Sequence, residues 1–450
     1  MMLLSEAAIA THGRVLGEDV SFTSVGTDSR KLSQGQLFVA LRGERFDGHA
    51  YAVSTLEQGA VAAMVATDEL PLKSALLVQD TRLALGELAA YWRRKFDIPL
   101  AAITGSNGKT TVKEMLAAIL RAEAGGDDFV LATEGNLNND IGLPLTLLKL
   151  RDQHRYAVAE MGMNHMGEIS YLTRIGRPTV ALVNNATTAH VGELGSVEAI
   201  AQAKGEIFQG LTEDGIAVIN VDDVFAPLWQ MLSAPHRVVT FGLDMHADVT
   251  ADYTLGAVSS QLRLKTPAGE VAVNLPAPGV HNVRNALAAT AVALAMGASL
   301  QAVADGLAGF RGAKGRLQQR VGLNGALVID DTYNANPASV RAAIDVLAAS
   351  PGKQLLVLGD MGELGDEAPA MHADIGSYAR QAGIKTLYTL GELTRHMVAA
   401  FGDGAQGYAS PEALVADLVK QIDKDTVVLV KGSRFMRMER VVDLIATNHT

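Results

Sequence analysis

The chain has 450 residues, with 38 Lys and Arg against 49 Asp and Glu, a net charge of -11 and no cysteine. This length exceeds what one hydrophobic core usually serves, so it predicts two or three domains of about 100 to 200 residues each. The acidic balance, without a block of basic residues, argues against nucleic acid as a partner. The lack of cysteine excludes disulfides and cysteine-ligated zinc.

The first residues do not have the pattern of a signal peptide. The stretch Met1–Glu6 carries an acid where a signal peptide would have its basic region. No apolar run approaches the about 20 residues needed to span a bilayer. We therefore expect a soluble, cytoplasmic protein without membrane insertion.

An N-terminal domain is predicted over residues 1–80 as a small α/β unit. A turn-rich piece containing Asp28, Ser29 and Arg30 comes first. Ser29 and Arg30 are candidates to hold a diphosphate or a uracil edge, but the residues alone favour a solvated turn with an Asp–Arg pair, because three polar residues in a turn are ordinary. The elements expected after this turn are a strand over 36–41, a helix over 51–59 and a strand over 61–65.

A central domain is predicted over residues 81–312, and its phosphate-binding loop is the most informative segment of the chain. In Thr104-Gly-Ser-Asn-Gly-Lys-Thr-Thr111, a Gly-rich turn joins an apolar run to a helix-forming segment. Backbone N–H groups of such a turn and of the helix N-terminus bind an anion, and Lys109 adds a positive charge. Thr110 can offer its hydroxyl to a Mg²⁺ ion. Ile103 stands where the full Walker pattern has a glycine, so the loop is a variant.

Around this loop the pattern predicts a doubly wound parallel sheet, with its site at the carboxyl ends of the strands. A helix over 81–96 leads into the loop strand, with apolar residues near the 3.6 period at Leu83, Leu85, Leu88, Ala89 and Trp92. Residues 247–276 change to alternating residues with turns, which indicates an antiparallel meander. Further strands, short and apolar on both faces, are expected over 156–160, 179–183, 216–220 and 237–241.

Three carboxylate or imidazole residues, Glu160, His190 and Glu193, are expected where these strands end. Glu160 closes a buried strand beside a Gly turn, and we expect it to complete a Mg²⁺ site begun by Thr110 rather than to be a surface carboxylate. His190, with Glu193 nearby, lies in a loop where a lone His is more often solvated. Lys204 lies in a helix expected over 197–210, where its spacing alone indicates only a solvent-facing charge.

A C-terminal domain over residues 313–450 is predicted to be Rossmann-like, because strands and helices alternate again. Asp330–Pro337 and Lys431–Arg434 follow two of its strands, so an acid and two cations are expected at one sheet edge. The Gly359–Gly365 loop lacks the Gly-x-Gly spacing, which argues against NAD. Before this domain, Asn282 and Asn285 open an Ala-rich helix, where they cap it or bind a purine edge. The strands are expected over 326–331, 354–359, 385–390 and 426–431.

Taken together, these motifs resemble the Mur ligase family of ATP-dependent amide-forming enzymes, in the right order over nearly the whole chain. The motifs that carry this resemblance are Thr104–Thr111, His281–Asn285, Gly315–Gln318, Asp330–Pro337 and Lys431–Arg434. Within the family, the resemblance is strongest to the branch that joins D-alanyl-D-alanine to UDP-N-acetylmuramoyl-tripeptide. Four further motifs point to this branch: Thr27–Arg30, Gly135–Pro144, Ala159–Asn164 and Leu358–Gly365.

The resemblance implies a substrate-binding N-terminal domain, a central ATPase domain and a C-terminal domain that closes over ATP. It also implies phosphorylation of the tripeptide carboxylate and attack by the amine of D-alanyl-D-alanine. Lys109, Glu160, His190 and Lys204 are the implied catalytic residues. Thr110 and Glu160 would hold one Mg²⁺ and His190 a second, and Lys204 falls where several members carry a carbamylated lysine that binds metal.

The resemblance also assigns nucleotide and substrate contacts. Asn282 and Asn285 match adenine contacts, and Arg316 with Asp331 matches ribose and phosphate contacts. The implied ATP-binding residues are Gly105, Ser106, Asn107, Gly108, Lys109, Thr110, Thr111, Asn282, Asn285, Arg316, Asp331 and Lys431. The candidate substrate-binding residues are Ser29, Arg30, Asn136, Asn138, Asn139, Tyr333, Asn334, Asn336, Ser433 and Arg434. We expect a monomer.

Other activities were weighed against this one. Folylpolyglutamate synthases have a similar loop but lack a preceding domain of this size, and a GTPase would need an Asn-Lys-x-Asp motif that the chain does not contain. Another amino-acid ligase of the family, one adding meso-diaminopimelate, would carry an Asp-Asn-Pro-Arg loop where this chain has Asn334-Ala-Asn-Pro337. The motifs are compatible with either meso-diaminopimelate or lysine as the third peptide residue.

Overall fold

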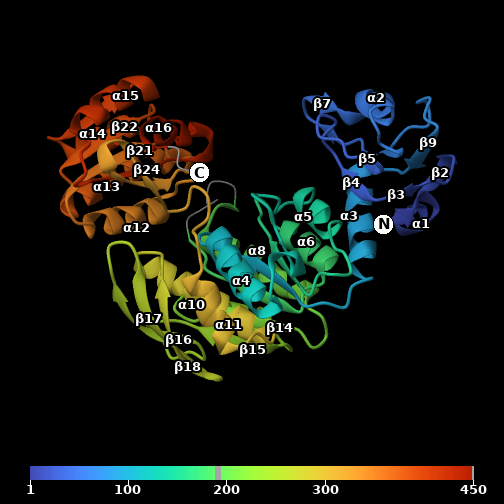
Figure 1. Cartoon of the computed structure of the whole chain (residues 1–450), viewed down its shortest axis with the longest axis horizontal. Coiled ribbons are helices and arrows are strands. Elements are labelled where there is room, and N and C mark those ends of the chain that lie inside the picture. Colours follow the sequence, from blue (N-terminus) through green and yellow to red (C-terminus); the bar gives the residue numbers. More distant parts are fainter. Residues whose placement is uncertain (188–193, 448–450) are drawn as a thin grey trace.

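The computed structural model describes residues 1–187 and 194–447, and these form three lobes arranged in an arc (Figure 1). The N-terminal and C-terminal lobes lie at the two ends of the arc, and the central lobe joins them. Each lobe is built on its own mainly parallel sheet with helices packed on it. The predicted three-part α/β architecture is therefore confirmed. Among the described residues, no helix is both long and apolar enough to cross a membrane.

The N-terminal lobe has a sheet in the order β2-β9-β8-β5-β4, in which only β2 runs antiparallel to its neighbour among the strands described. The predicted strand over 36–41 ends earlier, at Val39, and the helix predicted over 51–59 is shorter. The sheet strands are β2 Arg14–Gly17, β4 Ser24–Gly26, β5 Gln36–Val39, β8 Ala62–Val65 and β9 Ser74–Leu77. The other elements are β1 Met2–Leu3, α1 Leu4–Ala10, β3 Ser21–Phe22, β6 Arg42–Gly43, β7 Phe46–Asp47 and α2 Ala52–Glu57.

Helix α3, Thr81–Arg93, connects this lobe to the central one. It begins at Asp80, whose side chain accepts hydrogen bonds from the backbone of Arg82 and Leu83. Four of its five predicted apolar core residues are buried, but Leu83 is 55% exposed, so that assignment was wrong. The buried face packs into one apolar core that continues through both lobes. The domain boundary near residue 80 stays a prediction, as does the one near 312.

The central sheet is parallel, in the order β11-β12-β10-β13-β14-β15, with β10 between strands that come later in the chain. Alternate β10 residues enter opposite cores, since Ala102 packs in one cluster and Ala101 and Ile103 in the other. Edge strand β15 has half-exposed central residues, so the expectation of burial on both faces was wrong there. The strands are β10 Leu100–Thr104, β11 Val130–Ala132, β12 Tyr156–Glu160, β13 Val180–Val183, β14 Ile216–Asn220 and β15 Arg237–Phe241.

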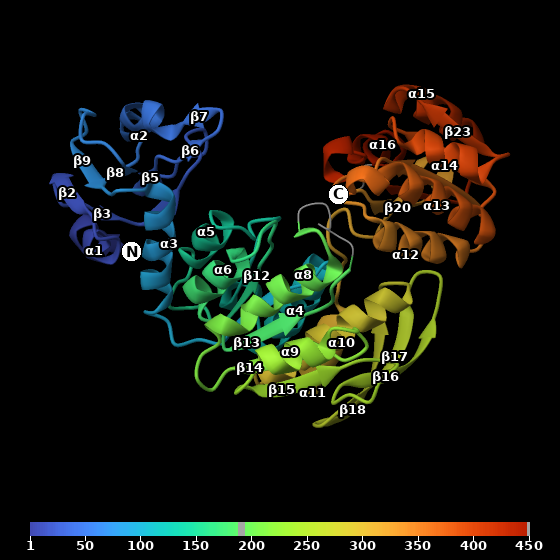
Figure 2. The ribbon, with the colours of Figure 1, turned by 180° about the vertical axis from the view of Figure 1, so that it is seen from behind.

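Helices cover both faces of this sheet, which confirms the doubly wound arrangement. Figure 1 shows α4, α10 and α11 on one face, and Figure 2 shows α6, α8 and α9 on the other. The helix predicted over 197–210 is split, because α8 ends at Gly205 and a 3-10 turn follows. The helices are α4 Lys109–Ala124, α5 Gly142–Leu147, α6 Glu168–Gly176, α8 Val197–Gly205, α9 Ala226–Leu232, α10 Val280–Ala295 and α11 Leu300–Ala308.

The predicted meander is also present. Strands β16 Thr250–Leu255, β17 Ser260–Thr266 and β18 Gly269–Leu275 pair antiparallel. Alternate β17 residues, Leu262 and Leu264, are buried in the same apolar core as α10 and α11. The meander therefore extends the central lobe beneath the C-terminal one (Figure 1).

The C-terminal lobe has a sheet in the order β19-β20-β24-β21-β22-β23, parallel except for β19 within the described strands. Strands β20 and β24 are neighbours, so the residues that follow them meet at one edge, as predicted. The strands are β19 Gln318–Val321, β20 Leu327–Asp331, β21 Lys353–Gly359, β22 Thr386–Leu390, β23 Ala405–Tyr408 and β24 Thr426–Lys431. The helices are α12 Pro337–Ala348, α13 Ala368–Gln381, α14 Thr394–Phe401, α15 Pro411–Leu418 and α16 Glu439–Ile445.

Candidate active site

The glycine loop joins the end of β10 to the first turn of α4, as the sequence predicted. Gly108 has φ of +81°, and a Cβ atom there would lie 2.4 Å from Oδ1 of Asn285, so the turn requires glycine. Lys109 curls back over the loop, and its Nζ donates hydrogen bonds to the carbonyls of Gly105 at 2.5 Å and Ser106 at 3.4 Å. Desolvation lowers the pKa of Lys109, partly offset by the Glu160 carboxylate. The loop and helix N-terminus form a concentrated anion site.

A second loop, which follows β13, holds the phosphate loop in shape. Oδ1 of Asn185 accepts a hydrogen bond from the backbone N–H of Asn107 at 2.8 Å. The side-chain amides of Asn184 and Asn185 donate to the Asn107 carbonyl at 3.0 and 3.1 Å. Our sequence reasoning assigned no role to these asparagines, although a tandem Asn pair directly after a buried strand was a usable signal.

Thr110 and Glu160 come together, as expected for a shared metal site. The hydroxyl of Thr110 donates to Oε2 of Glu160 at 3.0 Å, and Nδ2 of Asn138 donates to Oε1 at 2.8 Å. Glu160 is buried, so these two partners fix the direction of its carboxylate. His190, and with it Glu193, lies outside the described residues. Among the residues that are described, no group of three or more His, Asp or Glu side chains could hold a metal.

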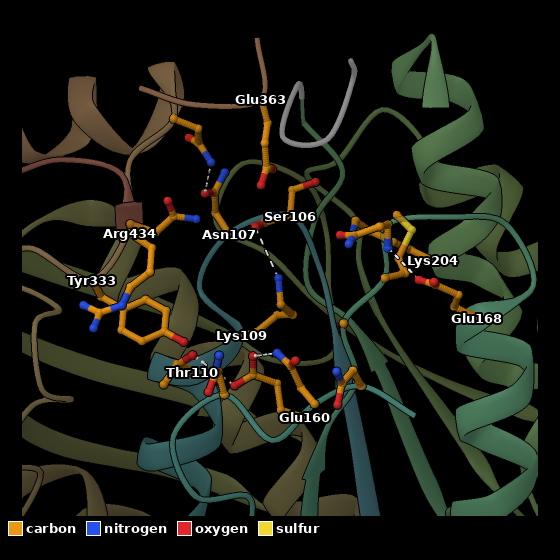
Figure 3. A pocket seen from close by; sticks show the side chains of 18 of the residues that line it. Ser106, Asn107, Lys109, Thr110, Glu160, Glu168, Lys204, Tyr333, Glu363 and Arg434 are labelled. Atoms are coloured by element: carbon orange, nitrogen blue, oxygen red, sulfur yellow. Dashed lines mark hydrogen bonds between the residues drawn. The ribbon is translucent and has the colours of Figure 1, made fainter. Parts of the chain in front are cut away.

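Lys204 does not point to solvent. Its side chain is 2% exposed, and no hydrogen-bond or ion-pair partner for it lies among the described residues. Burial, reinforced by the nearby positive charge of Lys109, lowers its pKa well below 10.5. Figure 3 shows Lys204 at the wall of the same cavity that Lys109 enters. Burial therefore disfavours the charged form of this amine, which lies at the wall of the cavity that holds the anion site.

The C-terminal lobe contributes side chains to the opposite wall of this cavity (Figure 3). The guanidinium of Arg316 lies 4.3 Å from the centre of the Tyr333 ring, and its buried Nε has no hydrogen-bond partner among the described residues. Nδ2 of Asn336 donates to Oδ1 of Asn107 in the phosphate loop, at 2.8 Å. The two lobes thus meet directly at the loop.

The cavity has a volume of about 1100 Å³ and lies between the central and C-terminal lobes. It brings together most of the residues that the sequence singled out. The predicted site residues that line it are Ser106, Asn107, Gly108, Lys109, Thr110, Asn136, Asn138, Asn139, Glu160, Lys204, Arg316, Tyr333, Asn334, Asn336, Ser433 and Arg434.

Other predicted residues lie behind this lining. Gly105, Thr111, Asn282, Asn285, Asp331 and Lys431 are not among the cavity-lining residues. Lys431 and Asp331 form a buried ion pair at 2.7 Å, and Nζ of Lys431 also donates to the carbonyl of Asn334 at 2.8 Å. This pair supports the wall of the cavity from within the C-terminal lobe.

Asn282 and Asn285 do not cap α10, so the capping alternative was wrong. Nδ2 of Asn282 donates to the carbonyl of Pro278 at 2.8 Å, and α10 has no side-chain cap. Oδ1 of Asn285 accepts a hydrogen bond from Asn184 at 3.3 Å and lies beside Gly108. Asn285 therefore belongs to the asparagine network that holds the phosphate loop.

Ser29 and Arg30 lie in the N-terminal lobe, away from the cavity. The Arg30 guanidinium hydrogen-bonds Asp28 at 2.8 and 3.0 Å, and this contact lowers the pKa of Asp28 to about 2. Arg30 is 85% exposed, so it forms with Asp28 the solvated pair that was one of the two alternatives from the sequence.

Several cavity residues were given no role in the sequence analysis, although some of them, such as Asp140 and Glu363, lie within the quoted motifs Gly135–Pro144 and Leu358–Gly365. The Gly359–Gly365 loop had been set aside as not binding NAD, yet Glu363 projects from it into the cavity with a φ of +61°. The missed residues include Arg82, Asp140, Met163, Asn164, Met166, Glu168, Tyr171, Ser339, Glu363, Leu364 and Phe435.

Comparison with known proteins matches the whole chain to one group of enzymes. The Mur ligase family catalytic domain matches residues 21–93, the Mur ligase middle domain 103–293, and the Mur ligase glutamate ligase domain 315–434. The chain is 44% identical to UDP-N-acetylmuramoyl-tripeptide–D-alanyl-D-alanine ligase of Escherichia coli K12, over 99% of both chains.

Solved structures give the same picture. A crystal structure of MurF from Acinetobacter baumannii superposes with a TM-score of 0.90 at 38% identity, covering 98% of both chains. MurF ligase from Thermotoga maritima, in complex with ADP, superposes with a TM-score of 0.82 at 28% identity, covering 94% of this chain and 96% of that one.

Proposed function

Since the chain belongs to the Mur ligase family, we propose that it joins D-alanyl-D-alanine to UDP-N-acetylmuramoyl-tripeptide in an ATP-dependent reaction. The observation that carries this proposal is the cavity between two lobes. A phosphate loop with Lys109 lines one wall, and Arg316 from the C-terminal lobe lines the other. The relative with this activity matches the chain from end to end, so substrate-binding as well as ATP-binding regions are shared.

The site fits a nucleoside triphosphate. The glycine loop and the first turn of α4 offer N–H groups, and Lys109 offers a half-buried ammonium. Nε of Arg316 has no hydrogen-bond partner among the described residues. Thr110 and Glu160 would hold Mg²⁺ through their oxygens. The metal would neutralise charge on the β- and γ-phosphates. We retain His190 as a second metal ligand, Asn282 and Asn285 as adenine contacts, and Asp331 and Lys431 as ribose and phosphate contacts, on the family resemblance.

The reaction we propose has two steps. The tripeptide carboxylate attacks the γ-phosphorus of ATP, so that ADP leaves and an acyl phosphate forms. The amine of D-alanyl-D-alanine then attacks the acyl carbon, phosphate leaves with the C–O bonding pair, and the amine loses a proton. Two anions react in the first step, and Lys109 and Arg316 reduce their repulsion.

We further propose that Lys204 is carbamylated in the working enzyme. A neutral amine is the form that adds CO₂, and burial beside Lys109 keeps Lys204 in that form. The product is a carboxylate, which would replace an unpaired buried amine with an oxygen ligand for metal. A carbamate resonance after exposure to ¹³C-labelled bicarbonate, absent in Lys204→Met, is the expected result, and its absence in the wild type would contradict carbamylation.

The substrates are assigned by lobe. We propose that the N-terminal lobe, through Ser29 and Arg30, binds the UDP part. The loop residues Asn136, Asn138 and Asn139 would bind the peptide from the central lobe. From the C-terminal lobe, the proposed substrate contacts are Tyr333, Asn334, Asn336, Ser433 and Arg434. We propose a monomer acting in the cytoplasm, where ATP and nucleotide-sugars are available.

A folylpolyglutamate synthase-like activity is not favoured, because the full-length relative at 44% identity is a D-alanyl-D-alanine ligase. The deciding assay measures ADP release from the purified protein with ATP, Mg²⁺, UDP-N-acetylmuramoyl-tripeptide and D-alanyl-D-alanine. We expect full turnover only when both substrates are present. Equal turnover with either substrate omitted would overturn the assignment.

A further inference from the structure

Arg82 and Asp140 form an ion pair in the wall of the cavity, where α3 meets the loop before α5. Nη2 of Arg82 donates to Oδ1 of Asp140 at 2.9 Å, and Nε donates to Oδ2. The two side chains are 53% and 30% exposed, so a ligand in the cavity can reach them. This two-point contact leaves further N–H donors on the guanidinium and further lone pairs on the carboxylate. The pair can therefore bind a ligand group of each charge at the same time.

The pair lies close to the expected reaction centre. Asp140 is two residues after Asn138, whose Nδ2 donates to Glu160 at 2.8 Å. Two residues of extended chain span at most about 7 Å, so Asp140 and Asn138 are neighbours in space. Glu160 in turn contacts Thr110 at 3.0 Å. A substrate that presents its carboxylate to the phosphate loop thus extends toward Arg82 and Asp140.

The surface beside the pair is apolar. Leu83 and Met166 line the cavity and are 55% and 49% exposed. Exposed large apolar side chains inside a polar cavity indicate a subsite for an aliphatic segment. A charged end group on a short hydrocarbon chain would meet both features, first the apolar surface and then the ion pair.

We propose that Arg82 and Asp140 select the third residue of the peptide as one whose side chain ends in both an ammonium and a carboxylate. This is the chemistry of meso-diaminopimelate and not of lysine, and the inference rests on the proposed function. In meso-diaminopimelate the reacting carboxyl carbon and the distal stereocentre are separated by five C–C bonds, about 6 Å when extended. That length is comparable with the at most about 7 Å of chain that separates Asp140 from Asn138, the residue that contacts Glu160.

The selection follows from the charges. The distal carboxylate would accept hydrogen bonds from Arg82, and the distal ammonium would donate to Asp140. A lysine side chain would donate to Asp140 but would bring no carboxylate to the remaining N–H donors of Arg82. A site that hydrogen-bonds a substrate group discriminates against the analogue that lacks it. Arg82 is therefore the specificity-determining residue, and Asp140 holds both the guanidinium and the substrate ammonium.

The experiment compares kcat/KM for UDP-N-acetylmuramoyl-tripeptides that contain meso-diaminopimelate or lysine, in the wild type, Arg82→Gln and Asp140→Asn. For Arg82→Gln we expect kcat/KM to fall about 10- to 100-fold with the diaminopimelate substrate and to change little with the lysine substrate. Asp140→Asn should lower both. Arg263→Gln is the matched control, because Arg263 pairs with Glu270 at 2.8 Å on the exposed meander, away from the cavity.

The outcomes separate this inference from the function on which it rests. The inference would be overturned by a wild type that has no preference between the two tripeptides. It would also be overturned by an Arg82→Gln variant that loses activity equally with both, because the ion pair would then have only a structural role. The thermal midpoint of each variant distinguishes such a role from unfolding, and Asp140→Asn supplies a second test if Arg82→Gln is unstable. A wild type that turns over neither tripeptide would overturn the proposed function itself, and this inference with it.

Discussion

Asn336 and Asn107 connect the C-terminal lobe to the phosphate loop through one hydrogen bond, from Nδ2 of Asn336 to Oδ1 of Asn107, at 2.8 Å. The same Asn336 side chain caps α12, because its Oδ1 accepts from the backbone N–H of Ser339 at 2.9 Å. A single amide thus fixes the start of a helix in one lobe and touches the anion site in the other. A movement of the C-terminal lobe would therefore be transmitted to the phosphate loop through this hydrogen bond.

A double-mutant cycle on this pair should reveal the coupling. We expect Asn107→Ala and Asn336→Ala each to lower kcat/KM for ATP, with a coupling of about 0.5–1.5 kcal/mol between them. Asn336→Ala should also lower the thermal midpoint, because a lost helix cap costs about 1 kcal/mol. Ser339→Ala is the control, since it removes the other half of the capping box without touching Asn107. Strict additivity would show that the contact does not couple the lobes.

The variant Lys109→Met tests the assignment of the phosphate-binding loop. Removing the ammonium that lies over Gly105 and Ser106 should lower kcat by at least about 10²- to 10³-fold, the usual effect of losing one preorganised charge-stabilising group. The thermal midpoint should change little. Lys113→Met, on the same helix, is the matched control: Lys113 is buried, donates to the carbonyl of Thr133 at 2.8 Å and does not line the cavity. Wild-type turnover by Lys109→Met would mean that the loop is misassigned.

The parts of this fold that sequence predicts are those fixed by local chemistry. The strand Tyr156–Glu160 has the predicted bounds because a continuous apolar run can only be a buried strand there. The phosphate loop is equally local, since its glycines, lysine and helix start are contiguous. Thr110 and Glu160 were paired correctly because Glu160 ends β12, and Thr110 lies in the first turn of the helix that follows β10, the parallel neighbour of β12.

What sequence missed depends on packing between distant segments. Arg82 and Asp140 are 58 residues apart; Arg82 lies in no recognised motif, and Asp140 lies in the Gly135–Pro144 motif but was given no role of its own. Leu83 fitted the helical period but faces the cavity, because an apolar subsite and an apolar core use the same residue types. Helix α8 ends at Gly205, where α9 packs so closely that a Cβ atom would lie 2.4 Å from Leu232. Lys204, the residue before it, is buried, although its spacing in the sequence indicated a solvent-facing charge.

Breaking the buried ion pair of Lys431 and Asp331 should strongly destabilise the folded protein. Their side chains are 1% and 8% exposed, so Lys431→Met would leave a carboxylate in the interior. Its remaining hydrogen-bond donor among the described residues would be the Leu317 N–H, at 3.2 Å. We expect a loss of about 3–5 kcal/mol, measured as a fall in the thermal midpoint. The double variant Lys431→Met, Asp331→Leu should recover much of this loss. Equal midpoints for the single and double variants would contradict a buried-charge penalty.

Lys204→Met should stabilise the protein in CO₂-free buffer while abolishing activity. The amine is charged in the unfolded chain but has a lowered pKa in the fold, so the unfolded state binds more protons between that lowered pKa and 10.5. Wild-type stability should therefore rise with pH through this window, and the variant should lose that rise. Near neutral pH we expect a gain of about 1–3 kcal/mol. Lys73 is exposed, so the control variant Lys73→Met should show neither effect. A Lys204→Met variant less stable than the wild type would contradict the conclusion that the Lys204 amine is buried without a partner among the described residues.

His281 gives a pH dependence of the same sign, in a more acidic range. Burial, with smaller effects from Asp331 and Lys431, lowers its pKa from 6.5 to about 4 in the fold. Between these values the unfolded state binds more protons, so this group's contribution is fully present above pH 6.5 and is lost as pH falls toward 4. Since one pKa unit corresponds to about 1.4 kcal/mol, the full loss amounts to about 3–4 kcal/mol.

The test of this pH dependence is the thermal midpoint of His281→Gln, measured across the same pH range. The variant lacks the titrating ring, so its midpoint should fall less steeply with acid than that of the wild type, and the two curves should converge or cross below about pH 5. His246→Gln is the matched control, because His246 is exposed in the loop before β16 and should leave the acid slope unchanged. If the His281→Gln curve ran parallel to that of the wild type, His281 would not be held neutral by its surroundings, and its position beside Asp331 and Lys431 would need another physical account.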